Sequence, residues 1–167
     1  MDTYASKGLS LNFKWIPHGR ALILVDIENL AGAGRVSVAA ALNVAAAIDL
    51  FFPKSHSHHR LVGCDRGNAI AVGEAFPGAR LLPGVGPDGA EIALLTAVEV
   101  LDVARRYTQV VIASGDGYFT EFAADAASLG LHVAVLTGYG GLSRRLRLAA
   151  HSHLQIEDAL NLYGEAA

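Results

Sequence analysis

The chain has 167 residues, a length typical of one domain, and 52% of them are hydrophobic against 17% charged. This composition excludes a disordered chain and is sufficient for a buried core. Every apolar run is interrupted before it reaches the roughly 20 residues of a membrane-spanning helix, and residues 1–15 lack the features of a secretory signal. We therefore expect a cytoplasmic protein that does not enter a membrane.

The charge of the chain is low overall but unevenly distributed. The formal net charge is −3, and Cys64 is the single cysteine, which excludes an intrachain disulfide and a cysteine-based zinc site. Residues 126–155 contain no acid, but they include Arg144, Arg145 and Arg147. Such a stretch is usually the solvated face of a helix, although arginines beside a metal site can also bind phosphate groups.

Short apolar runs alternate with segments of helical periodicity, a pattern typical of parallel βαβ units. The alternating residues Leu11, Phe13 and Trp15 predict an additional edge strand near the start of the chain. We predict a single three-layer α/β/α sandwich with a mainly parallel central sheet, formed by residues 21–162 between an extension, 1–20, and a tail, 163–167. The expected strands are 21–27, 60–64, 79–83, 109–114 and 131–136, and the expected helices are 36–52, 88–107, 118–129 and 142–150.

Polar residues follow two of these strands and begin the longest helix. Asp26 and Asn29 come at the end of the first strand, Ser114 and Asp116 follow the fourth, and Glu91 lies in the first turn of the long helix. Because ligands bind at the carboxyl ends of parallel strands, these side chains could converge there. Clustered carboxylates suit Mg²⁺ or Mn²⁺ and phosphoryl chemistry. A structural interpretation remains open, since Asn29 is also a common turn residue and the helix dipole alone favours Glu91.

Three motifs together resemble the NYN domains, in particular the LabA-like group of the PIN-like ribonuclease superfamily. They are ALILVDIENL, PDGAEIALLTAVEVLDVARR and VVIASGDGYFTEFAADAASLGLHVAVL, and the similarity extends over residues 21–160. The resemblance implies a PIN-like Rossmannoid fold and Mg²⁺- or Mn²⁺-dependent cleavage of RNA. The acids of the family's motifs fall on Asp26, Glu91 and Asp116, and its asparagine falls on Asn29.

This sequence departs from the family pattern at two acidic positions. Ala97 and Tyr118 stand where the family usually has further aspartates, and Glu91 is longer than the usual aspartate. Three carboxylates can hold one metal ion, whereas a second ion is not expected. The loss of two acids leaves open an activity that is weak or absent. The nearby acids that could substitute are Glu28, Asp88 and Glu121.

The leading hypothesis is a metal-dependent ribonuclease in which a metal-activated water hydrolyses phosphodiester bonds of single-stranded RNA. Asp26, Glu91 and Asp116 would hold the metal, and Asn29 and Ser114 would orient the metal, water or phosphate. The RNA-binding residues would be Tyr118, which could stack on a base, and Arg144, Arg145 and Arg147, which would guide the phosphate backbone.

Three alternatives belong to other classes. A catalytically degenerate NYN domain would act as an RNA-binding or protein-interaction module. A haloacid-dehalogenase-type phosphatase is disfavoured because its mechanism needs a lysine near the last acidic motif, and no lysine follows Lys54. A nucleotide-binding Rossmann domain is disfavoured because no G-x-G-x-x-G follows the first strand. Weakly charged helices also leave a homodimer open.

Overall fold

The computed structural model describes residues 19–54 and 58–156. In this part of the chain, the strands are β1 (Ala21–Asp26), β2 (His58–Asp65), β3 (Arg80–Gly84), β4 (Gln109–Ala113), β5 (His132–Thr137) and β6 (Ser152–Gln155). The α-helices are α1 (Ile27–Ala31), α2 (Val38–Phe51), α3 (Ala69–Ala75), α4 (Gly89–Thr96), α5 (Val100–Arg106), α6 (Thr120–Ser128) and α7 (Arg144–Ala149).

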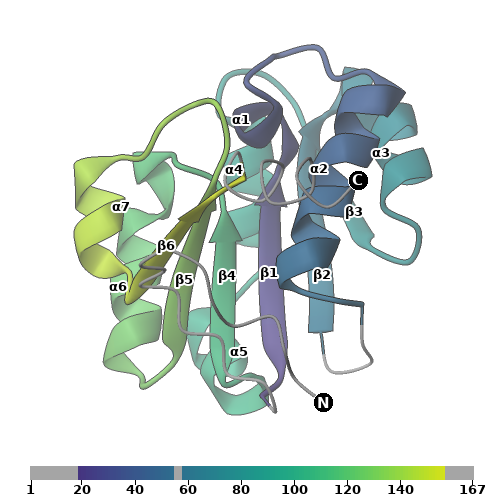
Figure 1. Ribbon diagram of the computed structural model, residues 1–167. Helices are drawn as coiled ribbons and strands as arrows, with labels where there is room; N and C mark the ends of the chain where they lie inside the picture. Colours follow the sequence, from purple (N-terminus) through teal and green to yellow (C-terminus); the bar gives the residue numbers. More distant parts are fainter. Residues whose placement is uncertain (1–18, 55–57, 157–167) are drawn as a thin grey trace, which may run out of the picture.

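The strands form one sheet in the order β3-β2-β1-β4-β5-β6, and every strand runs parallel to its neighbours. Helices α1, α2 and α3 pack on one face of the sheet, and α4 to α7 pack on the other (Figure 1). The predicted three-layer α/β/α sandwich is confirmed. The chain extends the sheet to one side of β1 through β2 and β3, and to the other side from β4 onward, so the strand order reverses between β1 and β4.

The central strand β1 contributes to both hydrophobic cores. All six of its residues are buried, and successive side chains point to opposite faces of the sheet. Ile23 and Val25 pack in the core beneath α2, whereas Leu22 and Leu24 pack in the core beneath α4 and α5. An uninterrupted apolar sequence is what a strand covered on both faces requires, and this explains why the alternating pattern of a half-exposed strand is missing.

The ends of the helices follow local sequence signals. The Ser37 hydroxyl accepts a hydrogen bond from the backbone N–H of Ala40, so it caps the start of α2. Gly130 follows α6 with a φ of +89°, a left-handed conformation that glycine adopts without steric cost. The strands and these helices lie within a few residues of their predicted bounds.

The prediction of one helix over residues 88–107 is wrong. The chain leaves helical geometry at Ala97 and resumes at Val100, which divides this segment into α4 and α5. Ala97 and Val98 pack against the core on this face of the sheet. Glu99 is extended, and its carboxylate accepts a hydrogen bond of 3.0 Å from the backbone N–H of Asp102, which caps the second helix. Packing of the partly buried Ala97 and Val98 against the core and a new cap at Glu99 therefore accompany the break in the helix.

Other expectations have mixed outcomes. Helices α1 and α3 and strand β6 had no separate prediction, and all three are short. The edge strand expected around residues 11–15 lies outside the described residues. Among the helices of residues 19–54 and 58–156, none has both the length and the apolar character needed to cross a membrane.

Candidate acidic site at the switch point of the sheet

The reversal of strand order brings the ends of β1 and β4 side by side. Val25 lies in register with Ala113, so Asp26, the last residue of β1, is followed across the sheet by Ser114, the first residue after β4. In parallel α/β sheets the crevice at this reversal is the usual ligand site. The sequence motifs around Asp26 and Asp116 therefore meet at one end of the sheet, which is the upper end in Figure 1.

Asp26 is fixed by hydrogen bonds from both strands. Its side chain is buried, and Oδ2 accepts a hydrogen bond of 2.9 Å from the Ser114 hydroxyl. Oδ1 accepts from the backbone N–H of Asn29 at 3.3 Å, so the same carboxylate also caps α1. Asn29 Oδ1 in turn accepts from the backbone N–H of Gly115 at 2.9 Å, and the backbone N–H of Asp116 donates to Ser114 Oγ at 3.1 Å. The predicted residues Asp26, Asn29, Ser114 and Asp116 thus form one hydrogen-bonded unit.

A glycine is required in the loop after β4. A Cβ atom at position 115 would collide with the carbonyl oxygen of Gly141. The backbone N–H of Ser143, immediately before α7, donates to the carbonyl oxygen of Gly115 at 2.8 Å. The close approach of these two backbones holds the loop after β5 against the site.

A hollow of about 330 Å³ opens beside Asp26. Five acidic residues line it, and they come from the ends of two strands and the starts of two helices: Asp26 and Asp65 end β1 and β2, Glu28 lies in the first turn of α1, and Asp88 and Glu91 lie at the start of α4. Asp88 has a φ of +56°, the left-handed region that is uncommon for residues other than glycine but that aspartate tolerates better than most. Within residues 19–54 and 58–156, none of the five forms a salt bridge. The hollow therefore concentrates negative charge without a basic partner from the described part of the protein.

The environment of Asp26 raises its pKa to about 7. Burial is the largest cause because it disfavours the charged carboxylate, and the negative charges of Glu91 and Glu28 add to it. The hydrogen bonds from Ser114 and from the backbone of Asn29 act in the opposite direction. At neutral pH the protonated and ionised forms of Asp26 are therefore both populated.

Glu91 belongs to the same electrostatic group. Its pKa is also raised, first by burial and then by the charges of Asp116, Asp88 and Glu28. Through Glu91 the structure links Asp26 to Asp116, the three acids on which the sequence motifs converge. Asp116 itself accepts a hydrogen bond of 2.8 Å from the backbone N–H of Tyr118, which caps the short 3₁₀ turn Gly117–Phe119.

Glu28 has a structural role that the sequence did not indicate. Its Oε1 atom accepts hydrogen bonds from the backbone N–H of Asp65 at 2.8 Å and from Asn68 Nδ2 at 2.6 Å. Asn68 also donates to the carbonyl oxygen of Gly34 and accepts from the backbone N–H of Val36. Glu28 therefore ties the end of β1 to the loop after β2, and its Oε2 atom is buried without a hydrogen-bond partner.

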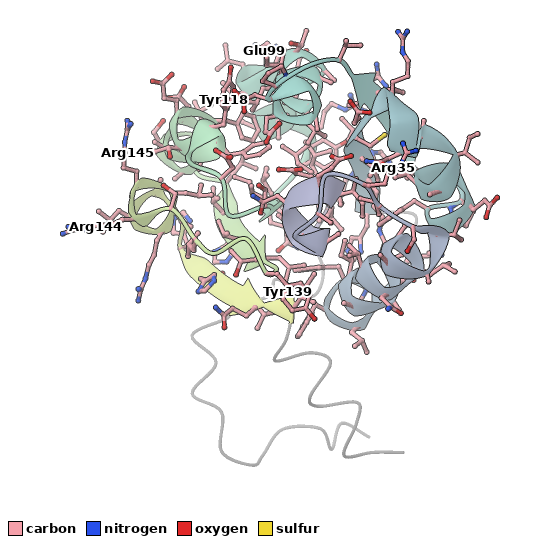
Figure 2. The ribbon with its side chains drawn as sticks, turned by 90° about the horizontal axis from the view of Figure 1, so that it is seen from above. Arg35, Glu99, Tyr118, Tyr139, Arg144 and Arg145 are labelled. Carbon is pink, nitrogen blue, oxygen red and sulfur yellow. The ribbon has the colours of Figure 1, made fainter. Side chains whose placement is uncertain are left out.

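The predicted RNA-binding residues lie outside the hollow. Tyr118 is 47% exposed. Arg144, Arg145 and Arg147 are exposed on α7 and form no ion pair with the described residues. Figure 2, which looks down on this end of the sheet, shows Arg144 and Arg145 pointing away from the centre of the molecule. The structure does not bring these arginines to the carboxylates.

Several residues at the site were missed or underrated from the sequence. Asp65 follows the rule that identified Asp26, because it is an acid at the carboxyl end of a parallel strand. Arg35 and Tyr139 are exposed in loops that no sequence pattern singled out, and Figure 2 shows Arg35 on the opposite side from Arg144 and Arg145. Glu121 is exposed in the first turn of α6 and does not line the hollow.

The donor atoms of the hollow are compatible with a hard divalent cation, although they do not form a closed cage. Among residues 19–54 and 58–156, no three His, Cys, Asp or Glu side chains are grouped closely enough to hold a metal ion by themselves. Mg²⁺ is commonly bound through one or two carboxylates while it retains several waters, so such a cage is not required. The unpaired carboxylates and the raised pKa values of Asp26 and Glu91 are consistent with a site that a cation would stabilise.

Comparison with known proteins gives similarity in fold. No protein-family model matches the chain, and no curated protein sequence matches it. A protein of unknown function from Vibrio parahaemolyticus has 14% identity and a TM-score of 0.52, with 87% of this chain and 98% of that chain covered. A Leishmania major protein called "putative Mar1 ribonuclease" has 15% identity and a TM-score of 0.41, with 86% of this chain and 82% of that chain covered. At these identities the similarity concerns the fold alone.

Proposed function

We propose that this protein is a metal-dependent ribonuclease whose active site is the acidic hollow at the switch point. The main supporting observation is the buried carboxylate of Asp26, whose pKa is about 7 because of burial and the nearby charges of Glu91 and Glu28. Accumulating unpaired carboxylates is costly for a folded protein, and clusters of groups with perturbed pKa values are enriched at functional sites. The motif resemblance to NYN domains supports the same conclusion.

The residues would have separate roles. Asp26, Glu91 and Asp116 would hold Mg²⁺ or Mn²⁺, which supplies a Lewis acid and lowers the pKa of a bound water. Ser114 and the backbone of Asn29 hold the Asp26 carboxylate in one orientation through two hydrogen bonds. Asn29 Oδ1 is occupied by the Gly115 amide, which leaves the Asn29 Nδ2 group as the donor for a phosphate oxygen.

RNA as the substrate follows from the motif resemblance and is supported by the charges around the hollow. A polyanion is repelled by carboxylates, so cationic groups outside the hollow would be needed to attract its backbone. Arg35 lies on one side, and Arg144 and Arg145 lie on the other. The exposed ring of Tyr118, adjacent to the Asp116 turn, offers a stacking surface for an unpaired base. These features favour a single strand over a duplex.

A cleavage assay tests this proposal. Wild-type protein would be incubated with an end-labelled, mixed-sequence single-stranded RNA in Mn²⁺, Mg²⁺ or EDTA, beside Asp26→Asn and Asp116→Asn. We expect cleavage that requires the metal and that falls at least about 100-fold in both variants. Asp125→Asn is the matched control, because Asp125 is an exposed acid on α6 that neither lines the hollow nor belongs to the hydrogen-bonded unit of Asp26, Ser114 and Asp116. Equal activity in Asp26→Asn and wild type would contradict the proposal.

The chemistry of the product ends is a second test. Attack by water leaves a 5′-phosphate and a 3′-hydroxyl, whereas attack by the ribose 2′-hydroxyl leaves a 2′,3′-cyclic phosphate. Products ligatable through a 5′-phosphate are therefore expected. A cyclic phosphate would contradict the proposed mechanism even if the RNA were cut.

A module that binds RNA or a protein without cleaving RNA is the second candidate. The observation that favours it is the lack, in residues 19–54 and 58–156, of three acidic or histidine side chains grouped tightly enough for a metal. Retention of RNA without cleavage in any metal, with the retention lost when Arg144 and Arg145 are both changed to Ala, would support this candidate over the nuclease.

A further inference from the structure

A second hollow, larger than the acidic one, lies at the opposite end of the sheet. Its volume is about 630 Å³, within the range of sites that bind small molecules. It is lined near the amino ends of the strands by Leu22 of β1, Leu61 of β2 and Arg80 of β3, and on the helical side by Val103 and Arg106 of α5. Because Leu22 and Asp26 lie at the two ends of β1, the two hollows are separate sites.

The walls of this hollow combine apolar surface with unpaired positive charge. Leu22, Leu61 and Val103 are buried core residues that form apolar walls. Arg80 and Arg106 are exposed, and neither forms an ion pair with any residue in the described ranges. The guanidinium groups are therefore available to an anion that also contacts apolar surface.

The other charged groups of the lining are already engaged. Arg60 and Lys54 both pair with Asp49, and Arg60 also donates to the carbonyl oxygen of Phe52. Glu99 accepts the backbone N–H of Asp102, and Asp102 forms an ion pair with Arg105. Asp49 partly offsets the charges of Arg60 and Lys54, and the contacts of Glu99 and Asp102 weaken their repulsion of an anionic ligand. Arg80 and Arg106 remain as the charges of this lining that no described residue pairs with.

Tyr107 lines the hollow beside Arg106. Its hydroxyl group and His59 Nδ1 are 2.6 Å apart in a hydrogen bond, and the two rings meet edge to face. The Arg106 guanidinium lies 5.6 Å from the centre of the Tyr107 ring, and Arg20 lies 5.5 Å from it. A cation held near an aromatic ring loses less conformational freedom when it binds an anion, which favours binding.

We propose that this second hollow binds a small phosphate ester with a flat apolar body, the chemical class to which nucleoside monophosphates belong. The phosphate would bind Arg80 and Arg106, since guanidinium groups pair with phosphate oxygens in a bidentate manner. The flat body would pack against the apolar wall formed by Leu61 and Val103. This site is independent of the proposed ribonuclease activity, because none of its residues lines the acidic hollow.

The experiment is a titration of the full-length, ¹⁵N-labelled protein with AMP, followed by amide chemical shifts. We expect saturable shifts at Leu61, Val103 and Tyr107, and about ten-fold or greater weakening of AMP binding in Arg106→Ala and in Arg80→Glu. Adenosine lacks the phosphate group that would bind the arginines, and inorganic phosphate lacks the flat body that would pack on the apolar wall. Both should therefore bind more weakly than AMP. Arg66→Ala is the control, because Arg66 is an exposed arginine that lines neither hollow.

Three results would overturn the proposal. One is the absence of saturable shifts when AMP is in 10-fold excess over about 1 mM protein. Under these conditions a complex with a millimolar dissociation constant is detectable. A second is a set of shifts confined to the acidic hollow. The third is equal weakening by Arg66→Ala and Arg106→Ala, which would indicate general attraction to positive charge. RNA cleavage is not a readout here, so failure of this proposal and failure of the proposed nuclease are distinguishable.

Discussion

The hydroxyl group of Ser114 donates a hydrogen bond of 2.9 Å to Oδ2 of Asp26, and both groups are buried. This contact joins the end of β4 to the end of β1 where the strand order reverses. It also stabilises the ionised form of the carboxylate, against the burial and the neighbouring charges that disfavour it. A single hydroxyl group therefore influences both the fold and the charge state of the candidate site.

Replacing Ser114 by Ala should destabilise the protein and raise the pKa of Asp26 further. The substitution removes the donor to Asp26 Oδ2 and the acceptor for the backbone N–H of Asp116. We expect a loss of about 2 kcal/mol in the free energy of unfolding, measured by urea denaturation. The matched control is Ser128→Ala, which removes only an exposed hydrogen bond to the Asp125 carbonyl oxygen and should cost less than about 0.5 kcal/mol. Equal effects of the two variants would contradict this prediction.

The stability of the metal-free protein should fall as the pH rises from about 4 to about 7. The pKa of Asp26 is raised from 3.8 to about 7 in the folded protein, so the folded state retains a proton that the unfolded chain has already released. The stabilisation is fully present below pH 4 and is lost as the pH rises through 7. Its upper limit is about 4 kcal/mol.

Asp26→Asn isolates this contribution, because the amide is neutral at every pH. In EDTA at pH 8 the variant should be more stable than the wild type, and near pH 4 the difference should disappear. Urea denaturation of both proteins at a series of pH values measures this difference in stability. Parallel stability curves for the two proteins would show that Asp26 has an ordinary pKa.

A divalent cation should stabilise the protein through the same carboxylate. Mn²⁺ at about 100 times its dissociation constant contributes about 2.7 kcal/mol to folding, which corresponds to several degrees in Tm. Protons compete with the metal for Asp26, so the rise in Tm should be larger at pH 8 than at pH 5.5. Thermal unfolding with Mn²⁺ and with EDTA measures this effect without any substrate. The same rise in Asp26→Asn as in the wild type would place the cation elsewhere.

The loop after β4 should not tolerate a side chain at position 115. A Cβ atom there would collide with the backbone of Gly141, so Gly115→Ala must displace one of the two segments. We expect a loss of about 3 kcal/mol and a disturbed hydrogen bond from the Gly115 amide to Asn29 Oδ1. Gly34→Ala is the control, since a Cβ at Gly34 meets nothing within 4 Å. Denaturation midpoints and amide shifts of both variants test the difference.

The sequence is informative wherever a local rule applies. The uninterrupted apolar strand at residues 21–25 and the glycine at 130 predict the central strand and the end of α6 correctly. Acids at the ends of strands also predict a candidate site at the carboxyl ends of the parallel strands. The break after Thr96 was not predictable in this way, because the helical periodicity continues through it and the packing of the partly buried Ala97 and Val98 against the core is a tertiary contact.

Side-chain direction is the part of the site that the sequence does not determine. The basic run at residues 144–147 was expected beside the acids, yet Arg144 and Arg145 point outward from α7. The contact between Glu28 and Asn68 spans 40 positions, so no local pattern contains it. The hollow lined by Arg80 and Arg106 is formed by strands and helices that are distant in sequence, and only the fold brings them together.

Two substitutions of Glu28 separate its structural role from its charge. Glu28→Gln retains an oxygen that can accept from Asp65 and Asn68, but it removes a negative charge that raises the pKa values of Asp26 and Glu91. We expect Glu28→Gln to lower the pKa of Asp26 with little loss of stability.

Glu28→Ala removes both the charge and the two hydrogen bonds. It leaves the backbone N–H of Asp65 and the side-chain amide of Asn68 without their acceptor, so it should cost about 2 kcal/mol. Urea denaturation compares the stability of the two variants, and NMR titration of the Asp26 carboxyl carbon compares its pKa. Both variants should lower that pKa, because both remove the charge. Equal destabilisation by Gln and Ala would mean that Glu28 acts through its charge and not as the clamp between β1 and the loop after β2.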